Sequence, residues 1–92
     1  MADIGDTLTE RGKRYGKFTG HASISQNLLA QIIRGDLSKW YDMDSDQREA
    51  LQMICHKIGR IVNGDPNYAD SWVDIAGYAK LVADRLEKNE ES

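Results

Sequence analysis

The stretch that decides the fold is "REALQMICHKIGRIVNGDPNYADSWVDIAGYAKLVADRL", residues 48–86. Before its central turn, apolar residues recur every three or four positions, at Leu51, Ile54, Cys55, Ile58, Ile61 and Val62. After the turn they recur at Trp72, Ile75, Ala79, Val82 and Leu86. This spacing places each set on one face of an α-helix. The stretch therefore predicts an antiparallel helical hairpin over about residues 45–87.

Capping and turn residues set the expected ends of these two helices. Asp44 or Ser45 is suited to cap the first helix at its N-terminus. Gly64 is expected to end it in a conformation with positive φ, as glycine often does just beyond a helix. Because proline fits the first turn of a helix, the second helix is expected to begin at Asp65-Pro66 or slightly later.

The N-terminal half predicts two further helices and two loops. One helix is expected over about Ile4 to Arg14, with Leu8 as its main apolar anchor. The other is expected over about His21 to Arg34, with an apolar stripe of Ile24, Leu28, Leu29 and Ile32. A basic loop with glycines at intervals of four, residues 11–20, separates them, and a loop carrying Trp40 and Tyr41 follows. With no strand pattern, we expect one all-α domain over residues 1–92, a bundle of about four helices.

Length and charge exclude several classes of protein. A net charge of −3 argues against a protein that coats DNA or RNA, because such proteins need a basic surface. No apolar run has the length of a signal sequence or a membrane span. The single cysteine, Cys55, lies on an apolar stripe and is expected to be a buried, inert thiol of a reducing cytoplasm. Since 92 residues give a small core, a homo-oligomer is expected.

The basic loop is the first candidate site. Arg11, Lys13, Arg14 and Lys17 surround Tyr15 and the glycines. Arginine and lysine bind phosphate, glycine amides approach it closely, and tyrosine can stack on a base. The loop is not a P-loop, because no Gly-Lys-Ser/Thr follows four variable residues. A flexible basic loop without a ligand is the alternative.

Polar residues at helical spacing in the hairpin form the second candidate site. On the first helix, Glu49, Met53, His56 and Arg60 fall opposite the predicted core stripe. The second helix carries a matching stripe of Asp70, Asp74, Tyr78, Leu81 and Arg85. Leu81 within a polar stripe indicates a second neighbour, and that neighbour could be another subunit. Surface ion pairs alone would also explain such stripes.

These stripes fit two kinds of ligand. Asp70 and Asp74 lie one turn apart and, with Glu49 from the facing helix, could hold a Mg²⁺ ion that also binds substrate phosphates. Alternatively, Lys57 and Arg60 add positive charge to a metal-free pocket for an anionic nucleotide.

Two sequence blocks resemble a family of small phage and prophage proteins of unknown function. The first block is R-G-x-x-Y-G-x-F, at residues 11–18. The second is H-K-I-x-R-I-x-N-G-D-P-x-Y-x-D-S-W-x-D-I-A-G-Y-A, at residues 56–79. The resemblance covers most of the chain and implies the cytoplasm of an infected or lysogenic bacterial host.

That family is more distantly similar to nucleotide-modification-associated helical domains and to MazG-like, Mg²⁺-dependent nucleotide pyrophosphohydrolases. MazG-like enzymes are oligomers that hold Mg²⁺ with an E-x-x-E/D pair on one helix and E-x-x-D on the next. Here Glu49 is the only acidic residue at the corresponding part of the first helix, and Asp70 and Asp74 are four apart rather than three. The resemblance therefore implies nucleotide binding more strongly than nucleotide cleavage.

The favoured hypothesis is an oligomer that sequesters a phosphorylated or cyclic signalling nucleotide as a counter-defence sponge, without catalysis or cofactor and with pockets near subunit interfaces. The candidate ligand-binding residues are Arg11, Tyr15, His56, Lys57, Arg60, Asp70, Trp72, Asp74 and Tyr78. Arg11, Lys57 and Arg60 would meet phosphate, and Tyr15 or Trp72 would stack. One alternative is a pyrophosphohydrolase or another phage enzyme of nucleotide metabolism that binds Mg²⁺ through Glu49, Asp70 and Asp74. The other is a protein inhibitor that acts on a protein partner and has no small ligand.

Overall fold

The computed structural model describes residues 4–91, and the side chains of residues 4–89, as an all-helical bundle. Its helices are α1 (Ile4–Tyr15), α2 (Phe18–Gly35), α3 (Leu37–Asp42), α4 (Ser45–Asn63) and α5 (Ala69–Glu91). No strand occurs in this part of the chain. The predicted all-α fold class is therefore confirmed.

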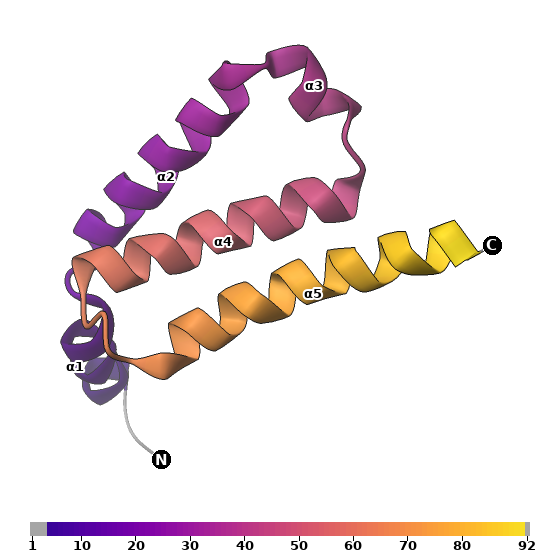
Figure 1. Cartoon of the computed structure of the whole chain (residues 1–92). Coiled ribbons are helices and arrows are strands. Elements are labelled where there is room, and N and C mark those ends of the chain that lie inside the picture. Colours follow the sequence, from indigo (N-terminus) through magenta and orange to yellow (C-terminus); the bar gives the residue numbers. More distant parts are fainter. Residues whose placement is uncertain (1–3, 92) are drawn as a thin grey trace.

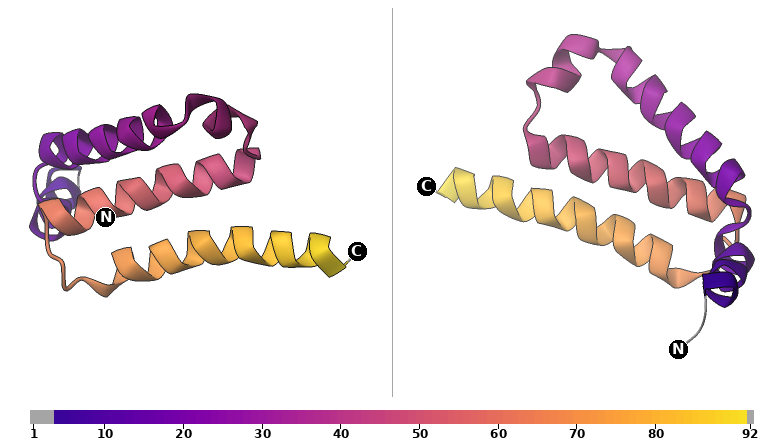
Figure 2. Two further views of the ribbon diagram at one scale, coloured as in Figure 1. Left: turned by 45° about the horizontal axis from the view of Figure 1, so that its top comes forward. Right: turned by 180° about the vertical axis from the view of Figure 1, so that it is seen from behind.

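Helix α4 is the central element. Helix α2 lies along one side of it and α5 along the other (Figure 1), and two further views keep this order (Figure 2). Helices α4 and α5 run in opposite directions, which confirms the predicted hairpin. Helix α1 folds across the end of the molecule where α2 begins and α4 ends.

The single core stripe predicted for each hairpin helix is wrong in part. Because α4 has neighbours on two sides, it buries residues around much of its circumference, namely Ala50, Cys55, Lys57, Gly59 and Ile61. Val62 is 67 % exposed and Trp72 is 55 % exposed, because their sides of α4 and α5 face away from the neighbouring helices. Among the other predicted core residues, those found exposed are Leu8, Ile32, Ala79 and Leu86. Cys55 is buried as predicted, and burial raises the pKa of its thiol.

A glycine lets α2 and α4 come close together. A Cβ at Gly59 would collide with Ser25 Oγ and would lie 2.8 Å from a ring carbon of His21. Ser25 and His21 are themselves buried, one turn apart on α2. The closest approach of the two helices therefore depends on small and polar side chains rather than on large apolar ones.

The segment predicted as a loop over residues 35–46 contains the short helix α3. Asp36 begins it, with its side chain accepting a hydrogen bond of 3.0 Å from the Lys39 amide. Trp40 is 7 % exposed and anchors the helix against the bundle. The prediction of a loop was wrong because a six-residue helix is too short to produce an apolar period.

The basic glycine-spaced loop is also mostly helical. Gly12 lies inside α1 and Gly20 inside α2, so only Gly16 and Lys17 lie between the two helices. Helix α2 begins at Phe18, three residues before the predicted start at His21. Gly16 has φ of 75° and ends α1 with the left-handed conformation that glycine adopts readily.

Gly64 ends α4, but not in the predicted way. Its φ is −126°, so it does not need glycine for a positive φ. Glycine is required because a Cβ there would collide with the Arg14 carbonyl oxygen and the Tyr15 backbone. Helix α5 begins only at Ala69, after a turn in which the Asp65 side chain accepts a hydrogen bond from the Asn67 amide.

Asn63 fastens the start of the turn after α4 to the link between α1 and α2. Its side-chain amide donates hydrogen bonds of 2.8 Å to both the Tyr15 and the Lys17 carbonyls. The Asp65 amide donates a third, of 2.7 Å, to the Arg14 carbonyl. A Cβ at Gly16 or Gly20 would collide with Asn63. The two sequence blocks therefore interlock through the Asn63 side chain and the backbone.

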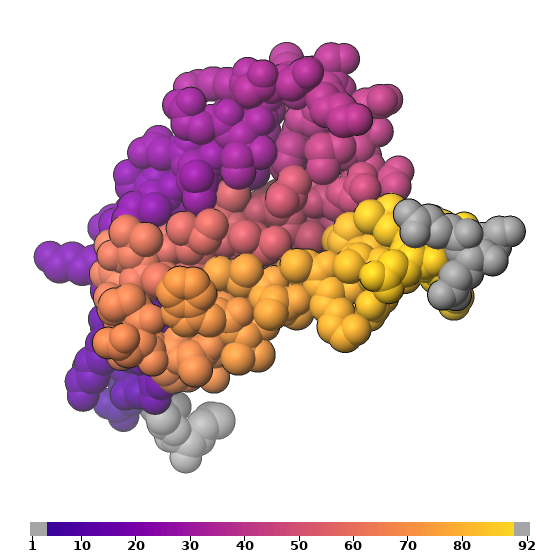
Figure 3. All heavy atoms as spheres, in the orientation of Figure 1, coloured from indigo at the N-terminus to yellow at the C-terminus, as the bar shows by residue number. Residues whose placement is uncertain are grey.

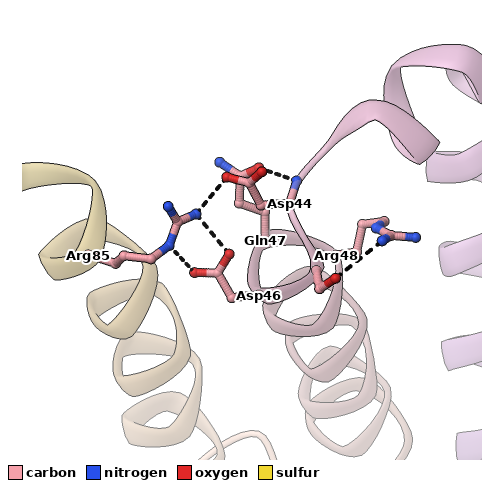
Figure 4. Close-up of polar contacts among 6 residues, drawn as sticks. Asp44, Asp46, Gln47, Arg48 and Arg85 are labelled. Atoms are coloured by element: carbon pink, nitrogen blue, oxygen red, sulfur yellow. Dashed lines mark hydrogen bonds and ion pairs between the residues drawn. The ribbon is translucent and has the colours of Figure 1, made fainter. Parts of the chain in front are cut away.

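Ion pairs connect α4 and α5 at the other end of the hairpin (Figure 4). Arg85 of α5 binds both carboxylate oxygens of Asp46, at 2.6 and 2.8 Å, and one oxygen of Asp44, at 2.9 Å. Gln47 accepts a hydrogen bond of 2.9 Å from the Asp44 amide and so helps to cap α4. The Asp44 and Asp46 side chains are exposed, whereas Asn63 and Gly64 at the interlocked turn are half-buried. Across residues 4–91, no helix is long and apolar enough to span a membrane.

Candidate functional site

Two hollows share one wall at the end of the molecule where α1 meets α4. The first, of about 330 Å³, has no carboxylate in its lining, and we call it the acid-free hollow. The second, of about 450 Å³, is lined by groups of both charges, and we call it the mixed-charge hollow. The acid-free hollow is lined by Leu8, Arg11, Gly12, Tyr15, Gly16, Lys17, Phe18, His21 and Arg60. The mixed-charge hollow is lined by Asp6, Thr7, Glu10, Arg11, Arg14, Tyr15, Arg60 and Tyr68.

Three residues, Arg11, Tyr15 and Arg60, line both hollows. Arg11 and Tyr15 lie one turn apart in the last part of α1, so they project from the same face of that helix. Arg60 lies in the last turn of α4. The hydrogen bonds from Asn63 and Asp65 fix the ends of these two helices against each other, and with them the relative position of the three side chains.

Guanidinium groups stack on tyrosine rings along the shared wall. The Arg60 guanidinium lies 4.2 Å from the centre of the Tyr15 ring, and the Arg14 guanidinium lies 4.3 Å from the centre of the Tyr68 ring. The two tyrosine rings are 6.1 Å apart and tilted by 58°. An arginine stacked in this way keeps the N–H groups at its edge available for an anion.

The acid-free hollow has a surplus of positive charge. Arg14 is neutralised by Glu10, at 2.8 Å. Within residues 4–89, however, no carboxylate forms an ion pair with Arg11, Lys17 or Arg60. The Nε–H of Arg60 is buried without an acceptor in this part of the chain. These three cations have no carboxylate partner among the described side chains, which favours an anionic ligand at this place.

A pair of neutral histidines lies behind the acid-free hollow. His21 Nε2–H donates a hydrogen bond of 3.0 Å to the His56 carbonyl oxygen, and the two rings meet edge to face at 4.4 Å. Burial, together with the smaller effects of the nearby His21, Arg60 and Lys57, lowers the pKa of His56 to about 4. Burial also lowers the pKa of His21. His21 therefore presents an uncharged ring to the hollow, and His56 supports that ring.

Arg11, Tyr15 and Arg60 are the predicted site residues that the fold brings together, whereas Lys57 and Asp74 lie elsewhere. Lys57 Nζ pairs with Asp74 Oδ2 at 3.0 Å, between α4 and α5. The Lys57 side chain is 11 % exposed, so this ion pair takes up its charge inside the hairpin.

The predicted residues at the start of α5 also have other partners. Asp70 accepts a hydrogen bond of 2.7 Å from the Tyr68 hydroxyl, and this bond raises the pKa of Tyr68. The Trp72 Nε1–H donates to the Pro66 carbonyl at 2.8 Å, while much of the ring is exposed. Tyr78 lines a separate shallow hollow on α5. Asp70, Trp72 and Tyr78 line neither the acid-free nor the mixed-charge hollow.

The three carboxylates considered for Mg²⁺ have separate surroundings. Glu49 lines a small hollow with Trp40 and Gln52, near α3. Asp70 and Asp74 are engaged with Tyr68 and Lys57, as described above. Among the described residues, no group of three or more His, Cys, Asp or Glu side chains has the arrangement of a metal site. The three carboxylates that the enzyme alternative assigns to Mg²⁺ are therefore not brought together within the described part of a single chain.

Several residues that line the two hollows are not among the site residues predicted from the sequence. The sequence does not single out Phe18 or His21. Phe18 falls in the segment predicted as a loop, and His21 stands at the predicted start of the next helix, where no local pattern indicates that it faces a hollow. The sequence also does not single out Tyr68, because its ring lies near Tyr15 of α1 only as a result of the hydrogen bond that joins the turn after α4 to the end of α1. Its position in the second sequence block was the one available signal. Arg14 and Lys17 belong to the basic segment around Tyr15 but are not among the predicted ligand-binding residues.

Residues 6–86 match the model of a family described as a domain of unknown function, DUF6378. This match covers most of the chain, which therefore belongs to that family. No curated protein and no solved structure matches the chain.

Proposed function

We propose that this member of the DUF6378 family binds a phosphorylated nucleotide in the acid-free hollow and holds it without cutting it. The observation that carries the proposal is the shared wall of Arg11, Tyr15 and Arg60, with the Arg60 guanidinium stacked on the ring. The phosphate would lie between Arg11, Lys17 and Arg60, and the base against Tyr15 or Phe18. The volume of about 330 Å³ lies in the range of small-molecule sites.

Holding rather than cutting is supported by the side chains that line this hollow. Cleavage of a phosphoanhydride needs groups that hold a metal ion or activate water, and carboxylates commonly do both. The acid-free hollow has none, and the Nε2 proton of His21 is engaged by the His56 carbonyl. Capture of a signalling nucleotide as a phage counter-defence is the use that we favour. It requires affinity and abundance but no chemistry.

A second candidate function is supported by the mixed-charge hollow. Asp6 and Glu10 lie one turn apart on α1 beside Arg11 and Tyr15. Carboxylates that line the same hollow as a bound phosphate could recruit Mg²⁺ for its hydrolysis. Since Glu10 already neutralises Arg14, we rank this function below capture.

The test incubates the purified protein with a panel of linear and cyclic nucleotides, with and without Mg²⁺. Free nucleotide is measured by HPLC before and after the protein is denatured. Capture predicts that one nucleotide is depleted and then returns unchanged on denaturation. A new product that appears only with Mg²⁺ would support hydrolysis instead, and absence of any depletion or product would remove both functions.

Two variants locate the site. Arg60→Ala should weaken binding by about tenfold to a hundredfold, because a charge-assisted contact to phosphate is lost. Its matched control is Lys39→Ala, which removes an exposed cation on α3, a helix that lines neither hollow. Tyr15→Ala should also weaken binding, whereas Tyr41→Ala, at an exposed ring on α3, should not. Equal binding by Arg60→Ala and the native protein would show that Arg60 is outside the site.

A further inference from the structure

The chain keeps more exposed surface than a folded monomer of its mass. Its accessible area is 6724 Å², whereas a monomer of 10.4 kDa is expected to expose about 5,400 Å². Its radius of gyration is 15.6 Å, compared with about 12 Å for a compact domain of this length. The surplus of roughly 1,300 Å² exceeds the area of about 800 Å² that each partner contributes to an interface of standard size.

Part of this surplus lies on one side of α5. Val73 is 64 % exposed and Leu81 is 68 % exposed, with the exposed Gly77 midway between them. On the face shown in Figure 3, no other helix covers α5. These three residues line a shallow hollow of about 430 Å³ together with Asp74 and Tyr78. We call these five residues the α5 patch.

We propose that the α5 patch binds the α5 patch of a second copy of this chain. In this arrangement two antiparallel α5 helices cross at Gly77, on a two-fold axis. Val73 and Leu81 lie four residues before and after Gly77. Each Val73 therefore meets Leu81 of the second copy, and the same surface serves both subunits, as a two-fold interface requires.

Gly77 gives independent support for this crossing. A glycine inside a helix costs stability relative to alanine. An added Cβ at Gly77 would meet no atom within 4 Å, so the fold of the single chain does not require glycine there. A helix crossing directly over Gly77 does require it, because the absent side chain lets the two backbones come close.

The charged residues around Gly77 are compatible with the same register. Asp74 and Lys80 lie three residues before and after Gly77, so each Asp74 falls near Lys80 of the second copy. Within the chain these two side chains already pair with Lys57 and Asp84. Asp70 and Asp84 lie seven residues before and after Gly77, so each Asp70 would face and repel Asp84 of the second copy if the two helices were strictly antiparallel. Ridges of residues spaced by four, such as Val73-Gly77-Leu81, pack with a crossing angle of about −50°. At this angle the helices diverge before the aspartates meet.

The mass of the protein in solution tests the interface. The native chain should sediment as a dimer or a larger even assembly that dissociates on dilution. Gly77→Leu should shift the protein toward monomer at the same concentration. Its monomer should melt at a higher temperature than the native monomer obtained on dilution, because leucine favours helix over glycine. Leu81→Asp should also give monomer. Leu37→Asp, at an exposed leucine of α3, is the matched control and should keep the assembly.

Cysteine cross-linking tests the symmetry. Gly77→Cys lies on the proposed axis, so two copies should form a disulfide under mild oxidation. Val73→Cys alone should link poorly, but a mixture of Val73→Cys and Leu81→Cys chains should link efficiently. Native Cys55 can stay in place because it is 2 % exposed. A monomeric native chain, or an assembly that Gly77→Leu and Leu81→Asp leave intact, would overturn the proposal. So would a mixture that links no better than either variant alone.

Discussion

The two ends of the α4–α5 hairpin are held together by different kinds of interaction. At the turn end, Asn63 and Asp65 bond to the backbone carbonyls of Arg14, Tyr15 and Lys17. At the other end, Arg85 binds two exposed aspartates (Figure 4). Backbone contacts that exclude a Cβ tolerate little change, whereas exposed ion pairs can rearrange in water.

The candidate nucleotide site lies at the turn end. Arg11 and Tyr15 come from α1 and Arg60 from α4, so their relative position depends on how those helix ends are joined. A site made from separate helices needs fixed supports. The comparison therefore predicts that changes at the turn end affect both stability and binding, whereas changes at the Arg85 end affect neither strongly.

The largest expected effect is that of Gly16→Ala. Alanine disfavours the φ of 75° at this position, and its Cβ would collide with the Asn63 carbonyl. We expect a loss of about 3 kcal/mol or more in the free energy of unfolding, measured by urea denaturation. Gly12→Ala is the matched control, because its Cβ has open space and alanine favours helix α1. Equal stability of the two variants would contradict the interlock.

Asn63→Ala should have the next largest effect. It removes both side-chain hydrogen bonds to the link between α1 and α2, and should cost about 2 kcal/mol in the free energy of unfolding. Nucleotide affinity should fall as well, because α1 is less firmly placed against α4. Asn27→Ala, which loses only a 3.5 Å contact on the surface, should change neither measurement. A stable Asn63→Ala variant with native affinity would show that the turn does not support the site.

A smaller effect is expected from acid. The pKa of His56 is lowered to about 4 in the folded protein, and that of His21 is also lowered, whereas both are near 6.5 in an unfolded chain. The unfolded state therefore binds more protons between these values, so stability should fall as the pH decreases from 6.5 toward 4. Unfolding in urea at pH 7.5, 6 and 5 measures this dependence. His56→Gln should flatten it, and an unchanged slope would remove His56 as a cause.

The smallest effect is expected at the far end. Arg85→Ala breaks the contacts to Asp44 and Asp46 and should lower the melting temperature slightly at low salt, with the difference disappearing at high salt. Nucleotide binding should not change. Lys39→Ala, at an exposed lysine of α3 that forms no ion pair within residues 4–89, should have a still smaller effect. A loss of binding by Arg85→Ala would show that the two ends are coupled.

The hairpin could be predicted because its helices are long and their apolar residues keep a helical period over many turns. The six-residue helix α3 is too short to show such a period. At the site, the pattern R-G-x-x-Y singled out Arg11 and Tyr15, and helical spacing singled out Arg60. Lys57, Asp74 and Trp72 have suitable chemistry but other partners. Lys57 pairs with Asp74 between α4 and α5, and the Trp72 indole N–H donates to the Pro66 carbonyl, contacts that no helical period predicts.

The sequence by itself determined the helical class, the hairpin, the buried cysteine and the positive charge around Tyr15, because these depend on local period and composition. The tertiary structure decided which glycines are needed and why. Gly16 turns the chain, whereas Gly59 and Gly64 admit another segment. It also decided which cations remain unpaired, since Lys57 finds a carboxylate on α5 and Arg60 finds a tyrosine ring instead. Both outcomes depend on contacts between residues far apart in the sequence, which no local pattern encodes.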